Sequence, residues 1–121
     1  MSSSVTAVRD MNHFYQVVDN ANGHGKLLVL EFMGKVSYRS TCEFMKPIFE
    51  SIAANCKKNN VKADFCTVDV DNKEFKELAK DCGVQALPTF LMILDYDEEA
   101  SIVAPNKEEL DESIGKYAPK T

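Results

Sequence analysis

Residues 38–42 (YRSTC) combine a thiol with a cation at the start of a predicted helix. A helix amino-terminus presents unpaired amide groups and the positive end of the helix dipole, and both stabilise a thiolate. The thiolate is the species that attacks a disulfide. Cys42 is therefore a candidate for thiol–disulfide chemistry, and Arg39, three residues ahead of it, is a candidate neighbour of the reacting group.

Glu31 is a second candidate, because it interrupts the apolar run at residues 27–32 (LLVLEF). Burial disfavours an ionised carboxylate, so we expect a raised pKa for Glu31. Acids with a raised pKa tend to mark functional sites. The alternative is a structural acid that is satisfied by a water molecule or a lysine.

Hydrophobic periodicity predicts the elements that position these side chains. Strands are predicted at 5–8, 27–32, 62–70, 89–94 and 100–103. Helices are predicted at 10–21, 41–58, 75–82 and 107–117, with Asp10 as the cap of the first, which ends in a turn at 22–25. Residues 95–99 read as an acidic hairpin tip. This alternation, closed by a hairpin, predicts an α/β fold with a mixed sheet covered by helices on both faces.

Length and charge limit the functions that this chain can have. The 121 residues predict a single domain, 1–121, and the net charge of −5, with scattered lysines, disfavours nucleic acid and anionic membranes as partners. Neither a signal peptide nor an apolar run of membrane-spanning length is visible. We expect a protein of the cytoplasm, with the nucleus as the alternative.

The four cysteines do not form a ligand pattern. They lie at 42, 56, 66 and 82, so none makes a Cys-x-x-Cys pair. No metal and no cofactor is expected. Cys56, Cys66 and Cys82 read as small apolar core residues, although an intermolecular disulfide through Cys66 or Cys82 stays open.

Four segments together identify a family. They occur in order at 27–32 (LLVLEF), 46–49 (KPIF), 67–72 (TVDVDN) and 83–90 (GVQALPTF). On these segments nearly the whole chain resembles the thioredoxin family. The resemblance implies the thioredoxin fold, a central mixed sheet of about five strands flanked by four helices.

The resemblance also assigns roles around Cys42. In that family the helix opens with Trp-Cys-Gly-Pro-Cys, and the second cysteine lies five residues before a proline, here Pro47. Cys42 then matches the second cysteine, Arg39 replaces the first, nucleophilic one, and Tyr38 replaces the tryptophan. The chain is thus an atypical member that cannot form the internal disulfide. Arg39 could lower the pKa of Cys42, bind an acidic partner or point to solvent.

Further positions match the family's site. Glu31 stands where a buried Asp is thought to shuttle a proton for the second cysteine. Leu87 and Pro88 match a loop with a cis proline, and with Tyr38 they would rim a peptide-binding groove beside Cys42. The implied partners are proteins with exposed cysteines or disulfides, with a thioredoxin reductase as a further candidate.

Three functions fit this sequence. The first is a binding module that kept the groove and lost dithiol chemistry, so that ordinary disulfide reductase activity is absent. The second is an oxidoreductase of reduced scope that forms mixed disulfides through Cys42 alone. The third is a variant of an active protein-disulfide reductase. The helix start itself is expected to survive, because Ser40 and Glu43 fit a capping box.

Overall fold

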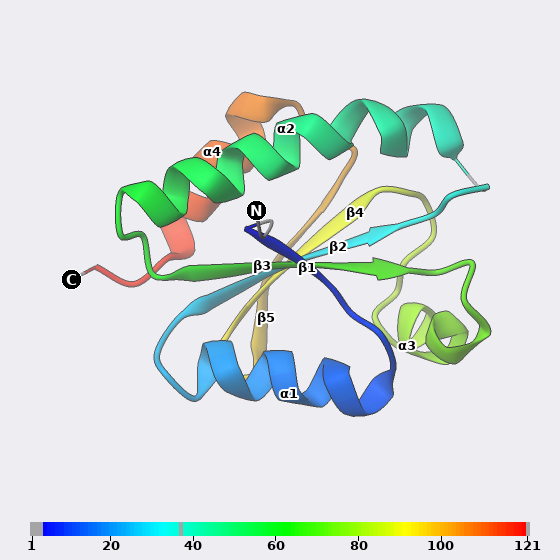
Figure 1. The fold of residues 1–121 in the computed structure, drawn as a ribbon, viewed down its shortest axis with the longest axis horizontal. Helices are drawn as coiled ribbons and strands as arrows, with labels where there is room; N and C mark the ends of the chain where they lie inside the picture. The colour runs from blue at the N-terminus through cyan, green and yellow to red at the C-terminus, as the bar shows by residue number, and fades with distance from the viewer. Residues whose placement is uncertain (1–3, 37, 121) are drawn as a thin grey trace.

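The chain folds into one five-stranded sheet between two layers of helices (Figure 1). This computed structural model describes residues 4–36 and 38–120. The strands are β1 (Val5–Ala7), β2 (Leu27–Met33), β3 (Ala63–Asp69), β4 (Thr89–Leu94) and β5 (Asp97–Val103). The helices are α1 (Met11–Asn22), α2 (Arg39–Lys58), the 3-10 turn η1 (Lys73–Phe75), α3 (Lys76–Asp81) and α4 (Lys107–Tyr117). The predicted order of strands and helices is confirmed.

The sheet is mixed, as predicted, and runs in the order β1-β3-β2-β4-β5. The first three of these strands are parallel, whereas β4 is antiparallel to β2 and β5 is antiparallel to β4. Strand β2 is central, and its first six residues are buried. It is apolar on both faces because helices cover both faces of the sheet.

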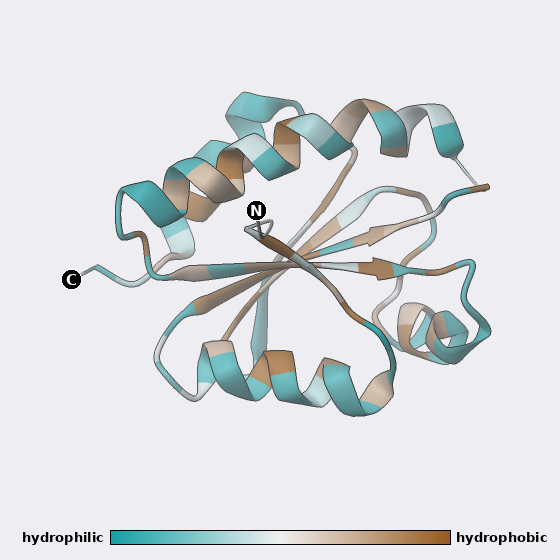
Figure 2. Ribbon diagram, viewed as in Figure 1, coloured by the Kyte–Doolittle hydropathy of each residue, from teal (hydrophilic) through white to brown (hydrophobic). Residues whose placement is uncertain are grey.

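The two faces of β2 contribute to two separate cores. Figure 1 shows α1 and α3 below the sheet and α2 and α4 above it. Leu28, Leu30 and Phe32 pack on the α1 face, while Leu27 and Val29 pack on the α2 face. Figure 2 shows the apolar residues concentrated on the strands and on the inward sides of the helices. Side chains alternate along a strand, so Glu31 points to the α2 face with Leu27 and Val29.

Two predicted boundaries are wrong. The hairpin tip is only Asp95 and Tyr96, both with positive φ (52° and 68°), and the acidic residues that follow already belong to β5. Two positive φ values in a two-residue loop are typical of the tight hairpin turn that matches strand twist. The helix predicted at 75–82 is shorter, and the 3-10 turn η1 precedes it. This turn starts at Asn72, whose side chain accepts a hydrogen bond from the Glu74 amide.

Candidate functional site

Helix α2 begins at Arg39, two residues earlier than predicted. Tyr38 is its N-cap residue, in the left-handed region with φ 55°, and its carbonyl accepts the Cys42 amide at 3.0 Å. The Tyr38 side chain makes no capping hydrogen bond. The predicted capping box is therefore wrong, because Ser40 already lies inside the helix and Glu43 accepts from Arg39 Nε at 2.9 Å instead.

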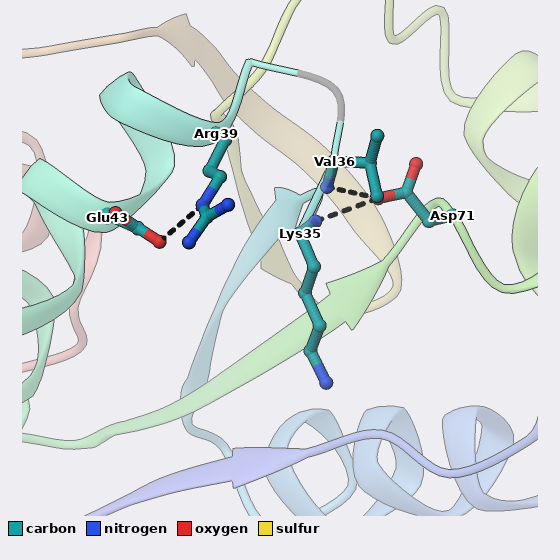
Figure 3. Close-up of polar contacts among 5 residues, drawn as sticks. All are labelled: Lys35, Val36, Arg39, Glu43 and Asp71. Atoms are coloured by element: carbon teal, nitrogen blue, oxygen red, sulfur yellow. Dashed lines mark hydrogen bonds and ion pairs between the residues drawn. The ribbon is translucent and has the colours of Figure 1, made fainter.

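Asp71 fixes the loop that leads into α2. Its Oδ2 atom accepts the backbone amides of Lys35 and Val36 at 2.8 and 2.9 Å (Figure 3). Asp71 follows β3, so the carboxyl ends of β2 and β3 are tied together beside the start of α2. Sequence reasoning missed this role. Asp71 lies in the TVDVDN segment, which supported the family resemblance. The segment alone does not show which backbone amides its acidic residues bind.

Arg39 is exposed and pairs within its own helix. Its side chain is 69% exposed, and the guanidinium of Arg39 lies against Glu43 (Figure 3). Glu43 raises the pKa of Arg39 through this hydrogen bond and its charge. Of the three alternatives for Arg39, a lowered pKa of Cys42 finds no support, since the pKa of Cys42 is raised and Arg39 is not among the groups that shift it.

Cys42 is buried, with only 4% of its surface exposed. Burial raises the pKa of its thiol, and the negative charges of Glu31, Asp71 and Asp69 raise it further. A hydrogen bond with the Gly34 backbone opposes this rise in pKa only in part. The thiol is therefore protonated at neutral pH, and a protonated, enclosed thiol is a poor nucleophile.

Glu31 is likewise buried, with 3% of its surface exposed. It lies opposite Thr67 of β3 and Phe90 of β4. Burial raises the pKa of its carboxyl to about 8. The side chain is thus mainly neutral at pH 7, as the apolar run around it predicts.

Glu31, Arg39 and Cys42 line one cleft between the sheet and α2. Tyr38, Leu87 and Pro88 do not line it. The Leu87–Pro88 peptide bond is cis, and the Pro88 carbonyl accepts the Ala104 amide at 2.8 Å. Leu87 is buried, whereas Tyr38 is 53% exposed.

The four cysteines are all free thiols. Cys56 and Cys66 lie in the two cores, and Cys82 is partly buried against the α1 face. Burial raises the pKa of Cys66 to about 12. Across residues 4–36 and 38–120, no three side chains of His, Cys, Asp or Glu gather as metal ligands, and no helix there is long and apolar enough to cross a membrane.

Comparison with known proteins agrees with this fold. A family model described as thioredoxin matches residues 4–116. The chain belongs to the thioredoxin family. A rice H-type thioredoxin is 33% identical over 97% of this chain and 89% of its own length. Thioredoxin H4 of Arabidopsis thaliana is 36% identical over 86% of this chain and 82% of its own.

A solved structure shows the same arrangement as this thioredoxin-family chain. The crystal structure of a thioredoxin from Nicotiana alata superposes with a TM-score of 0.84 at 28% identity, covering 98% of this chain and 96% of the other. The predicted thioredoxin fold is confirmed. Family membership supports a function in thiol redox chemistry.

Proposed function

We propose that this thioredoxin-family protein binds partner proteins through the groove rimmed by Tyr38, Leu87 and Pro88, and that it does not reduce disulfides as a dithiol enzyme. Its proposed partners carry exposed cysteines or disulfides, and a thioredoxin reductase is a further candidate. Its proposed location is the cytoplasm, with the nucleus as the alternative.

The observation that carries this proposal is Arg39 at the first helical position of α2. Dithiol exchange requires one thiol to attack and a second to resolve the mixed disulfide. Arg39 occupies the position that the attacking thiol takes in the family, and its guanidinium is held by Glu43. Cys42 remains without the thiol that would pair with it.

The burial of Cys42 weighs against the single-thiol alternative. A mixed disulfide needs a thiolate that an incoming sulfur can reach. Cys42 is 4% exposed and its pKa is raised by burial. We therefore rank the binding module above an enzyme that works through Cys42 alone.

Exposed apolar side chains at the start of α2 support the binding role. Val36 is 80% exposed, Tyr38 is 53% exposed and Phe44 is 69% exposed. Exposed apolar side chains that lie together are typical of an interaction surface, and these three fall within residues 36–44. Asp71 holds the loop that carries the first of them.

A disulfide-reduction assay tests the loss of dithiol chemistry. Insulin reduction by dithiothreitol should proceed at the uncatalysed rate with the natural chain, because one buried thiol cannot complete the exchange. Arg39→Cys should accelerate the reaction by roughly tenfold or more, since it restores the attacking thiol. Arg39→Ser is the matched control, which removes the cation without adding a thiol and should stay at the uncatalysed rate.

Two results would contradict the proposal. Turnover by the natural chain that disappears in Cys42→Ser would establish the single-thiol enzyme instead. Turnover that persists in Cys42→Ser would assign the chemistry to another cysteine.

The groove itself is tested by binding. A cysteine-containing peptide, with its thiol alkylated, should shift the amide NMR signals of Tyr38 and Leu87, and Tyr38→Ala should weaken its binding. Shifts confined to other parts of the sheet would remove the groove from the proposal.

A further inference from the structure

A cleft of about 610 Å³ lies between strand β1 and helix α2. We call it the β1–α2 cleft. Its apolar lining comes from Val5, Ala7, Val8, Met33 and Phe49. Small-molecule sites in proteins are mostly apolar clefts of about 300–1,000 Å³ with a few placed polar groups, so this cleft has the volume and lining of a ligand site.

The most buried polar group in this lining is the Glu31 carboxyl, on a residue that is only 3% exposed. No hydrogen bond to this carboxyl is found within residues 4–36 and 38–120. Every fully buried side-chain oxygen in those residues has a hydrogen-bond partner. The Glu31 oxygens have none, so they are not fully buried and open into the cleft that Glu31 lines. A buried polar group without a partner costs free energy, which a ligand that pairs with it would recover.

The charges around the cleft favour an uncharged ligand. The other charged residues that line the cleft come from the loop, β3 and α2 and are Lys35, Arg39, Glu43, Lys46, Glu50 and Asp69. These are three cations and three anions, so their charges sum to zero. The carboxyl of Glu31 and the thiol of Cys42 are mainly protonated at pH 7, because burial raises the pKa of each.

A protonated carboxyl presents one O–H donor and one carbonyl acceptor side by side. An amide or a lactam presents the complementary pair, a carbonyl acceptor and an N–H donor. We propose that the β1–α2 cleft binds a small uncharged molecule with an apolar body and an amide or lactam head group, which forms two hydrogen bonds with Glu31. Tyr38, Leu87 and Pro88 do not line this cleft, so a ligand in it does not depend on the proposed function.

Three matched probes test the chemistry of this ligand. Benzamide, benzoate and benzylamine share one ring and differ in the charge of the head group. In an amide NMR titration at pH 6.5, benzamide should shift the signals of Glu31, Met33 and Thr67 in a saturable way. Benzoate and benzylamine should bind at least tenfold more weakly. Equal binding of all three probes, or benzamide shifts confined to Tyr38 and the Pro88 loop, would overturn the proposal.

Variants locate the site. At pH 9.5 the ionised Glu31 can no longer donate, so benzamide should bind the natural chain at least fivefold more weakly than at pH 6.5. Glu31→Gln keeps a donor and an acceptor at both pH values and should bind equally at both. Glu77→Gln on α3, the same change on the other face of the sheet, should behave like the natural chain.

A filling variant gives a test that does not involve titration. Ala7→Trp, on the exposed edge strand β1, places a ring in the β1–α2 cleft and should abolish the benzamide shifts while the remaining spectrum keeps its dispersion. Benzamide binding that is unchanged in Ala7→Trp or independent of pH in the natural chain would overturn the proposal.

Discussion

Asn22 and Glu31 are both buried polar side chains, 5% and 3% exposed, yet their surroundings differ completely. The Asn22 amide donates to the Lys26 carbonyl at 2.9 Å and to the Ile93 carbonyl at 3.0 Å. Its Oδ1 atom accepts the Tyr96 amide at 2.9 Å. The Glu31 carboxyl has no hydrogen bond among the residues that the structure describes.

The difference separates a structural polar group from a group kept for a site. Asn22 joins the end of α1 to the loop before β2 and to the β4–β5 turn, so each hydrogen bond fixes a different segment. A fully satisfied buried polar side chain specifies structure in this way. The Glu31 carboxyl joins no two segments, so it adds no such order, and the proposed ligand of the β1–α2 cleft would give it a partner.

The largest effect should come from titrating Glu31. Its pKa is 4.5 when solvated and about 8 in the fold, so the unfolded chain loses this proton first as the pH rises. The carboxyl's contribution to stability is intact below pH 4.5 and is lost progressively up to pH 8, by about 1.4 kcal/mol per pH unit and about 4–5 kcal/mol in all. Urea denaturation of the natural chain and of Glu31→Gln at half-unit steps of pH measures it.

Glu31→Gln supplies the reference because it stays neutral while every other ionisable group is retained. The free energy of unfolding of the natural chain should fall relative to Glu31→Gln between pH 4.5 and 8 and then run parallel to it. Parallel curves over the whole range would mean that the Glu31 carboxyl is ionised in the fold and has a partner.

Removing the Asn22 amide should have the next largest effect. Asn22→Ala deletes three hydrogen bonds and leaves the Tyr96 amide and the Lys26 and Ile93 carbonyls without this partner, for a loss of about 3 kcal/mol in the free energy of unfolding. Guanidinium denaturation measures it. Asn20→Ala, an exposed position on the same helix, is the matched control. A loss in Asn22→Ala no larger than in Asn20→Ala would remove the distinction between Asn22 and Glu31.

Short-range patterns in the sequence predicted most of the fold. Periodicity placed the helices and strands, and Asp10 was predicted as the first helix cap, where it accepts the His13 amide at 2.7 Å. The apolar run around Glu31 predicted its burial. These features depend on neighbours within a few residues, which is the range over which a sequence pattern carries information.

The features that sequence analysis missed depend on distant partners. Asn22 reads as a turn residue after a helix, but its partners include Ile93 and Tyr96, which lie 71 and 74 residues away. Asp71 binds the amides of a loop 35 residues earlier. The cleft beside Glu31 also needs the edge strand β1, whose position next to β3 follows from the topology of the whole sheet.

The smallest effect should come from the Tyr96 side chain, which lies at the exposed end of the hydrogen bonds around Asn22. Tyr96 donates its hydroxyl to Asp19 at 2.9 Å, but its side chain lies in solvent, while its backbone amide donates to buried Asn22. Tyr96→Phe deletes only the exposed bond, and water replaces it, so the free energy of unfolding should stay within the error of a denaturation curve. Asp19→Asn should also return the raised pKa of Tyr96 toward its ordinary value in an absorbance titration, since the Asp19 hydrogen bond and charge raise it. A loss in Tyr96→Phe that approached the loss in Asn22→Ala would show that the turn is held by its surface side chains and not by the buried amide.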